Sequence, residues 1–250
     1  MEERRLEFSV KGRKLVGILH LPPRRGEERF PCVICSHGYI SNKESRKYLQ
    51  IGRQFSLEGI AVLRFDHRGA LGGESDGNPE DTTLTGRVED NYAALDSLKA
   101  TREIDSNRLG LLGSSLGGMD ILLVKNQAVK AKVVIATPFS FPDSSEEMLN
   151  SFLRKGYYQF LDGSRIKNDF YEDLKQYDLK KEVSQMNCPI LIIHGDLDEQ
   201  IPLHHAKVLF EVVREPKELR IIEGGDHTFS DINKLNEVLT LSLDWFRKYF

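Results

Sequence analysis

Short apolar segments alternate with amphipathic segments along most of the chain, and this alternation limits the possible folds more than any other feature. The apolar segments are typical of strands that are buried on both faces of a sheet. The amphipathic segments carry apolar residues at helical spacing. Strands that alternate with helices form βαβ units, so the chain is predicted to adopt an α/β fold with a mostly parallel central sheet flanked by helices. The predicted strands cover residues 31–36, 60–66, 108–115, 132–138, 189–195 and 219–224, and the predicted helices cover 45–59, 84–100, 203–214, 231–250 and the segment that begins at Leu116.

The whole chain, residues 1–250, is predicted to form one domain. A single α/β unit often reaches about 250 residues, and no internal repeat or low-complexity linker divides this sequence. Residues 6–22 read as two strands around a turn at Gly12, because apolar residues alternate there with more polar ones. We expect this hairpin to lie antiparallel at one edge of the sheet.

One segment, about residues 139–187, interrupts the alternation. It contains no convincing strand and is predicted to be a small helical insertion. Such an insertion could simply cover a sheet edge, or it could form a cap whose aromatic side chains line a substrate pocket. The cap is favoured because the segment follows the carboxyl end of a strand, where open α/β sheets place their sites. Its aromatic residues are Phe139, Phe141, Phe152, Tyr157, Tyr158, Phe160, Phe170, Tyr171 and Tyr177.

Composition and charge argue against several classes of protein. Apolar residues make up 40% of the chain and charged residues 29%, which is typical of a globular protein rather than a disordered or membrane-spanning one. The net charge of −3 indicates no affinity for nucleic acid or an anionic membrane. Three cysteines indicate no disulfide framework, and the first residues lack the apolar core of a signal peptide. We therefore expect a reduced, cytoplasmic protein.

The sequence GSSLG at residues 113–117 has the pattern G-x-S-x-G and lies between an apolar strand and an apolar helix. In this context the pattern predicts a nucleophile elbow, a strained turn that exposes the hydroxyl of Ser115. Small residues are needed on both sides of the serine so that strand and helix can pack closely. The alternative is a tight strand-to-helix turn in which the serine has no catalytic role. Ser114 is the only other candidate nucleophile in this motif.

A serine is a weak nucleophile at neutral pH and needs a base. Of seven histidines, His227 is the best candidate, because it lies among glycines in the loop after the last predicted strand. His37 and His194 each follow a strand and precede a glycine, so they are expected to brace loops. His204 and His205 are expected to be exposed at the start of a helix. His20 lies in the first hairpin and His67 in the FDHRG loop.

An acidic residue should orient the base, and the loop HGDLDEQIP offers Asp198 and Asp196. Asp198 is preferred because the acid must reach sideways to the imidazole, and Asp196 is the alternate. The resulting chain order, Ser115, Asp198 and His227, is that of α/β-hydrolases and differs from the orders of chymotrypsin and subtilisin.

Two backbone N–H groups should stabilise the oxyanion that develops during acyl transfer. The first candidate is the amide of Leu116, which follows the predicted nucleophile. The second is the amide of Tyr39, in the loop after the strand at residues 31–36. The ring of Tyr39 could form a wall of the acyl pocket or could stack in the core.

Five pieces of the sequence together resemble the α/β-hydrolase superfamily: SHGY, RFDHRGALGGESDG, GSSLGG, HGDLDEQIP and IEGGDHTFSD. They are most similar to the serine hydrolases that include bacterial cinnamoyl (feruloyl) esterases and monoacylglycerol-lipase-like proteins. The resemblance implies that Ser115 forms an acyl-enzyme, that Asp198 and His227 complete a triad, and that Tyr39 and Leu116 form the oxyanion hole. It also implies that the insertion at 139–187 shapes an acyl or phenolic-acid pocket. The FDHRG loop is longer than in that family, and the insertion lacks obvious identity with the family's cap.

The expected function is that of a serine carboxylesterase acting on small or aromatic (hydroxycinnamoyl-like) acyl esters. Two alternatives remain open: a thioesterase or peptidase that uses the same triad, and a non-catalytic ligand-binding protein on this fold. No metal-ligand cluster, GxGxxG or P-loop is present, so no cofactor is expected. The expected partner is a small-molecule ester, with neither nucleic acid nor membrane, and a homodimer is possible.

Overall fold

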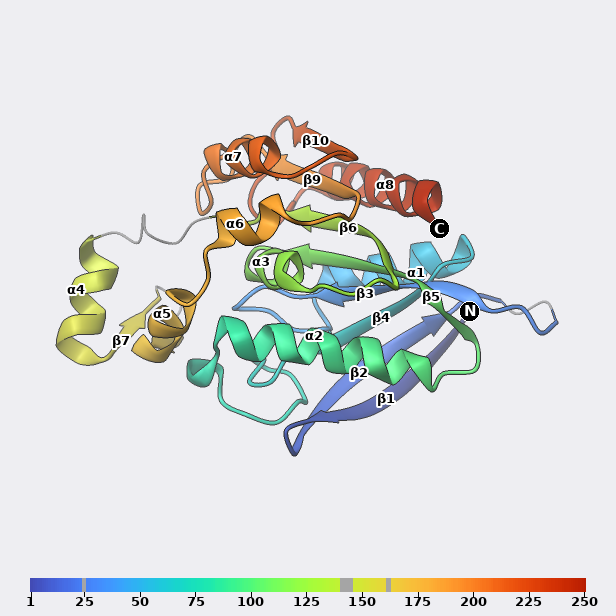
Figure 1. Cartoon of the computed structure of the whole chain (residues 1–250), viewed down its shortest axis with the longest axis horizontal. Helices are drawn as coiled ribbons and strands as arrows, with labels where there is room; N and C mark the ends of the chain where they lie inside the picture. Colours follow the sequence, from blue (N-terminus) through green and yellow to red (C-terminus); the bar gives the residue numbers. More distant parts are fainter. Residues whose placement is uncertain (24–25, 140–145, 161–162) are drawn as a thin grey trace.

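The central feature of the computed structural model is an eight-stranded sheet in the order β1-β2-β4-β3-β5-β6-β9-β10 (Figure 1). The structure describes residues 1–23, 26–139, 146–160 and 163–250. β2 pairs antiparallel with both β1 and β4, and every other neighbouring pair in this sheet is parallel. The predicted α/β fold and the antiparallel N-terminal hairpin are therefore confirmed. The strands are β1 (Glu2–Val10), β2 (Arg13–Leu21), β3 (Phe30–Ser36), β4 (Ala61–Asp66), β5 (Ile104–Ser114), β6 (Val129–Ile135), β9 (Ile190–Gly195) and β10 (Lys217–Ile222).

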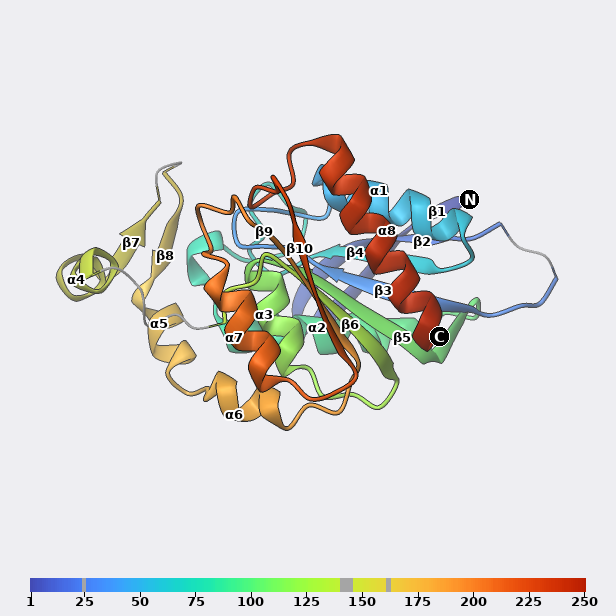
Figure 2. The ribbon, with the colours of Figure 1, turned by 90° about the horizontal axis from the view of Figure 1, so that it is seen from above.

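Helices cover both faces of this sheet (Figure 2). α1 (Arg46–Leu57) and α8 (Ile232–Tyr249) share one hydrophobic cluster with one face. α2 (Leu84–Lys99), α3 (Leu116–Leu123) and α7 (His204–Val212) pack in a second cluster on the other face. Neighbouring residues of one strand alternate between these clusters, because successive side chains of a strand point to opposite faces. Cys32 and Cys35 accordingly belong to different clusters and are both buried and free.

The segment predicted as an insertion leaves the sheet after β6 and returns at β9. Its described part contains α4 (Glu146–Lys155), α5 (Asn168–Leu174), α6 (Leu179–Ser184) and a two-stranded antiparallel sheet of β7 (Tyr157–Gln159) and β8 (Arg165–Lys167). α4, β7 and α5 project from the end of the molecule toward which β5 and β6 run (Figure 1).

The prediction that this segment contains no strand was wrong. β7 and β8 have three residues each, which is too short for an alternating pattern to be detected in the sequence. Residues 140–145 and 161–162, including Phe141, lie outside the described residues. That the segment acts as a cap stays a prediction.

Candidate active site

The turn between β5 and α3 has the geometry that the G-x-S-x-G pattern predicts. Ser115 lies between the two elements with φ 56° and ψ −125°, a strained backbone conformation that residues other than glycine rarely adopt. Its neighbours must be small, since a Cβ on Gly113 would lie 2.2 Å from the carbonyl oxygen of Gly117. A Cβ on Gly117 would lie 2.1 Å from the carbonyl oxygen of Ser36. The elbow therefore depends on glycine at both positions.

Gly117→Ala is expected to destabilise the protein by about 3 kcal/mol or more, because backbone on β3 and α3 must move apart. The gain in helix propensity from alanine, about 1 kcal/mol, is too small to offset this. Gly12→Ala is the matched control: its φ is +77° and no atom lies within 4 Å of the added Cβ. That control should cost only about 1–2 kcal/mol of backbone strain. Equal unfolding free energies for the two variants in urea titrations would contradict the close packing at the elbow.

The structure brings the three predicted residues Ser115, His227 and Asp198 together. His227 Nε2 lies 3.2 Å from Ser115 Oγ, and His227 Nδ1 lies 2.8 Å from Asp198 Oδ2. Ser115 and His227 are partly exposed, whereas Asp198 is buried. A proton on Nδ1 that is donated to the carboxylate leaves the lone pair of Nε2 directed at the serine hydroxyl.

Asp198 is held in place from several directions. Its Oδ1 accepts hydrogen bonds from the amides of Gln200 and Ile201 at 3.0 and 2.8 Å. Its Oδ2 lies 3.3 Å from Nε2 of His194, a fully buried ring that also donates to the carbonyl of Ile201 at 2.8 Å. Burial opposes ionisation, but the hydrogen bonds with His194, His227 and Ile201 outweigh it and hold the pKa of Asp198 below its usual value.

The alternate acid, Asp196, takes no part in this arrangement. It is exposed, and its Oδ1 accepts a hydrogen bond from the amide of Gly224 at 2.6 Å. Asp196 thus ties the loop after β9 to the loop after β10, whereas Asp198 contacts the histidine. His194 has the loop-bracing position that its sequence context predicts.

The loop after β3 lies directly beside Ser115. A Cβ on Gly38 would be 3.4 Å from the Cβ of Ser115 and 3.9 Å from its Oγ. Tyr39 follows Gly38 in this loop, so its amide is close to the serine in space. Leu116, the first residue of α3, follows the serine directly in the chain. The ring of Tyr39 is partly exposed and lies beside Phe160 of the insertion, with the two ring centroids 5.4 Å apart and the rings tilted by 43°. The hydroxyl of Tyr39 donates to the carbonyl of Arg165 in β8. That this ring forms a wall of the acyl pocket stays a prediction.

A buried polar network holds the loop after β3 against α2 and α3. Arg87 on α2 donates to the carbonyl of His37 and to Asp120 Oδ2, the latter at 2.8 Å. Asp120 Oδ1 accepts from Ser36 Oγ and from Asn91 Nδ2, both at 2.8 Å. Burial raises the pKa of Asp120 to about 6, although Arg87 opposes this shift. The network joins α2, α3 and the loop after β3, and the sequence analysis did not identify it.

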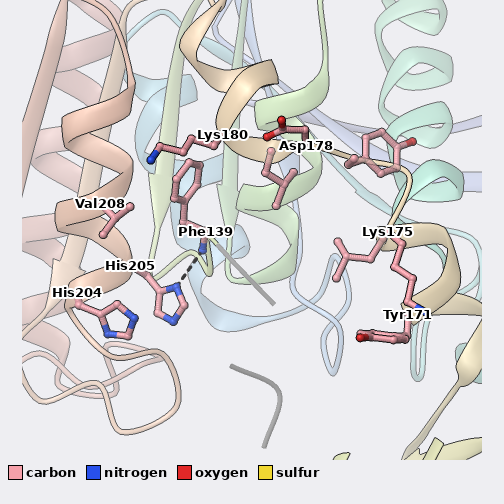
Figure 3. Close-up of a pocket in the computed structure, with 11 residues that line it drawn as sticks. Phe139, Tyr171, Lys175, Asp178, Lys180, His204, His205 and Val208 are labelled. Carbon is pink, nitrogen blue, oxygen red and sulfur yellow. Dashed lines mark hydrogen bonds between the residues drawn. The ribbon is translucent and has the colours of Figure 1, made fainter. Parts of the chain in front are cut away.

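Of the remaining histidines, His205 differs from its prediction and His37 agrees with it. His205 is buried rather than exposed, and its Nδ1 accepts a hydrogen bond from the amide of Phe139 at 3.2 Å (Figure 3). It lies at the first turn of α7, which faces the segment after β6 instead of solvent. His37 braces the loop after β3 as predicted, because its Nε2 accepts from the amide of His67 at 3.0 Å.

A pocket of about 360 Å³ lies between α7 and the insertion (Figure 3). Neither Ser115 nor His227 belongs to its lining, but Phe139 follows β6, the strand next to the one that ends at Ser114. Charged residues of α6 and of the turn between α5 and α6 also line it: Lys175, Asp178 and Lys180. Its aromatic and aliphatic lining consists of Phe139, Tyr171, Leu174, Tyr177, Leu179 and Val208.

No group of three His, Cys, Asp or Glu side chains within the described part of the chain is arranged to hold a metal ion. None of the helices in the same part of the chain has the length and apolar character that crossing a membrane requires.

The profile of the prolyl oligopeptidase family matches residues 53–250, from within α1 to the last residue. The chain belongs to the prolyl oligopeptidase family. The match includes the elbow of this family member and both loops that carry Asp198 and His227. Its fold is shared by solved structures that include the α/β-hydrolase GrgF from Penicillium. Together with the family match, this shared fold confirms the resemblance to the α/β-hydrolase superfamily.

Several curated proteins and solved structures are similar to this prolyl oligopeptidase family member. The uncharacterized protein YfhR of Escherichia coli is 27% identical over 90% of the chain and 74% of its own length. The bovine mitochondrial palmitoyl-protein thioesterase ABHD10 is 26% identical over 85% of the chain and 72% of its own length. An esterase domain from Rhodothermus marinus is 27% identical with a TM-score of 0.75, covering 100% of this chain and 99% of that one. Est1E from Butyrivibrio proteoclasticus, solved with ferulic acid, is 21% identical with a TM-score of 0.80, covering 97% and 99%.

Proposed function

We propose that the protein is a serine carboxylesterase that hydrolyses small or aromatic acyl esters. The observation that carries the proposal is the hydrogen-bonded series from Ser115 through His227 to Asp198, with the serine on a strained turn at the start of a helix. A nucleophile within reach of a base, and a base oriented by an acid, is the arrangement that acyl transfer requires.

In the proposed reaction His227 Nε2 takes the proton of Ser115 as Oγ attacks the ester carbonyl carbon. The amides of Leu116 and Tyr39 donate to the tetrahedral oxyanion. His227 then protonates the leaving alcohol as the carbonyl–oxygen bond breaks, which leaves an acyl group on Ser115. Water, deprotonated by His227, attacks the carbonyl carbon of this acyl-enzyme, and the acid is released as the bond to Ser115 Oγ breaks and His227 returns the proton to Oγ. Asp198 stabilises the imidazolium in both steps.

The substrate class is supported by the surroundings of the elbow. Aromatic residues of the insertion, among them Tyr158, Phe160 and Tyr171, pack against a cluster that contains Leu116 and Met119. The pocket beside Phe139 is lined mainly by aromatic and aliphatic side chains and has room for a small apolar or aromatic group. The similarity to the esterase domain from Rhodothermus marinus favours an ester substrate, and the ferulic-acid complex of Est1E is consistent with an aromatic acyl part.

Two other bonds could be cleaved by the same residues. The similarity to a palmitoyl-protein thioesterase favours an acyl thioester, and the family's name favours a peptide bond. The chemistry at Ser115 would be the same in each case, so substrate preference distinguishes them. A non-catalytic binding protein would instead fail to react with a fluorophosphonate probe.

The test is a panel of p-nitrophenyl esters from acetate to palmitate, with methyl ferulate, a palmitoyl thioester and a peptide p-nitroanilide beside them. We expect kcat/KM to be highest for the short esters or for methyl ferulate, because a short or aromatic acyl group fits the apolar pocket of about 360 Å³. A higher kcat/KM for the thioester or the anilide would replace the esterase with one of the alternatives. Turnover of no substrate, together with no fluorophosphonate labelling, would contradict an enzymatic role altogether.

A further inference from the structure

The first turn of α1 contacts three of the loops that build the candidate active site. Arg46 Nη1 donates to the carbonyl of Ser230, in the loop that carries His227, at 3.2 Å. Lys47 Nζ donates to Ser114 Oγ, one residue before the proposed nucleophile, at 2.9 Å. Tyr48 Oη donates to the carbonyl of Ser36, at the start of the loop with Tyr39, at 3.2 Å. This turn thus lies against the loop after β3, the elbow and the loop after β10.

Lys47 is the residue in this turn that joins two of these loops through one atom. Its Nζ, which donates to Ser114, also lies 5.6 Å from the centroid of the Phe229 ring, within the range of a cation–π contact. Phe229 is buried and has φ 55°, a conformation that only its surroundings can maintain. The ammonium therefore connects the residue before Ser115 with the residue two positions after His227.

The electrostatic surroundings of Lys47 come from the loops after β9 and β10. Burial lowers the pKa of Lys47 to about 8, while the carboxylates of Asp226 and Asp198 act in the opposite direction. β5 contributes only the neutral hydroxyl of Ser114 to this contact, and the loop after β10 also carries His227. The positive charge on Lys47 can therefore be removed by raising the pH moderately, while most other lysines stay charged.

We infer that Lys47 is a positioning residue. It fixes the position of the elbow relative to the loop after β10, so that Ser115 and His227 stay within hydrogen-bond distance. The inference rests on the esterase activity proposed above. It differs from a general stabilising role because the cation–π contact and the attraction to Asp226 and Asp198 need the charge. When the side chain of Lys47 is deprotonated, the neutral amine can still donate a hydrogen bond to Ser114, but its electrostatic attraction to the loop after β10 is lost.

The test compares wild type with Lys47→Met and Lys47→Arg, using p-nitrophenyl acetate across a range of pH. At neutral pH we expect Lys47→Met to lower kcat about tenfold with KM within about twofold, because a displaced base affects the chemical step more than binding. Lys47→Arg should keep most of the activity, since it retains the charge. Above about pH 8 the wild-type kcat should fall toward that of Lys47→Met, whereas kcat of Lys47→Arg should stay level.

Thermal unfolding and circular dichroism show whether each variant is folded. If Lys47→Met does not fold, the inference is tested by comparing the pH profiles of kcat for wild type and Lys47→Arg. Wild type and Lys47→Arg with the same alkaline profile would overturn the inference, as would a kcat of folded Lys47→Met equal to that of wild type. These outcomes are distinct from failure of the proposed function, in which Ser115→Ala would keep its esterase activity.

Discussion

Ser115→Ala is expected to lower kcat for ester hydrolysis at least ~10⁴-fold while the protein stays folded, because alanine has no oxygen that could form an acyl-enzyme. Any residual rate would come from binding and from the oxyanion donors. The substitution adds no bulk to the turn, so little change in stability is expected from packing. The measurement is the kcat of the purified variant with p-nitrophenyl acetate, together with fluorophosphonate labelling and a thermal unfolding curve.

Ser114→Ala is the matched control for this variant, because Ser114 is the neighbouring serine on the same turn. Its Oγ accepts the hydrogen bond from Lys47, so its loss should lower kcat by no more than about tenfold. Full labelling of Ser115→Ala, combined with loss of labelling in Ser114→Ala, would show that the assignment of the nucleophile is wrong by one residue.

Asp198→Asn is expected to lower kcat by about 10⁴-fold, the loss that this substitution causes in a serine protease triad. The asparagine would fill the same space and could keep the hydrogen bonds from Gln200 and Ile201. It would, however, present either an amide N–H or a weaker acceptor to His227 Nδ1. The imidazole would then favour the tautomer with a proton on Nε2, which cannot accept the proton of Ser115. Single-turnover kinetics should show the loss in acylation.

Asp196→Asn is the matched control, since Asp196 is two residues away in the same loop and does not contact His227. It is exposed and bonds the amide of Gly224, so kcat should change by no more than about tenfold. A large loss in Asp196→Asn with a small one in Asp198→Asn would reverse the choice of acid.

Much of the candidate site could be predicted from the sequence because its residues lie directly after apolar strands. Ser115, Asp198 and His227 each follow a strand of a parallel sheet, and the carboxyl ends of such strands meet at one edge. The order of motifs along the chain was therefore enough to expect three distant residues together. The choice between Asp198 and Asp196 rested on reach alone, and the structure places only Asp198 beside His227.

Other features left little or no signal in the sequence. β7 and β8 are too short to have a detectable pattern, and His205 lies at a helix start whose burial depends on the segment after β6. Asp120 stands out as a charge within the apolar stretch LGGMDILLV, which could have pointed to a buried partner, but nothing in the sequence identifies that partner as Arg87. Lys47 looks like any other lysine on an exposed helix face until its neighbours are known.

The sequence alone therefore determined the order along the chain of the strands of the large sheet and of the helices outside the insertion, the strained turn at Ser115 and the loops from which the base and acid come. These follow from local properties: the period of apolar residues, the small size of glycine and the position of a residue after a strand. Only the tertiary structure decided which side chains from different loops touch, as Tyr39 touches Phe160 and Lys47 touches Ser114 and Phe229. Such contacts depend on the distances between elements far apart in the chain, which the packing of the whole domain sets and no local pattern records.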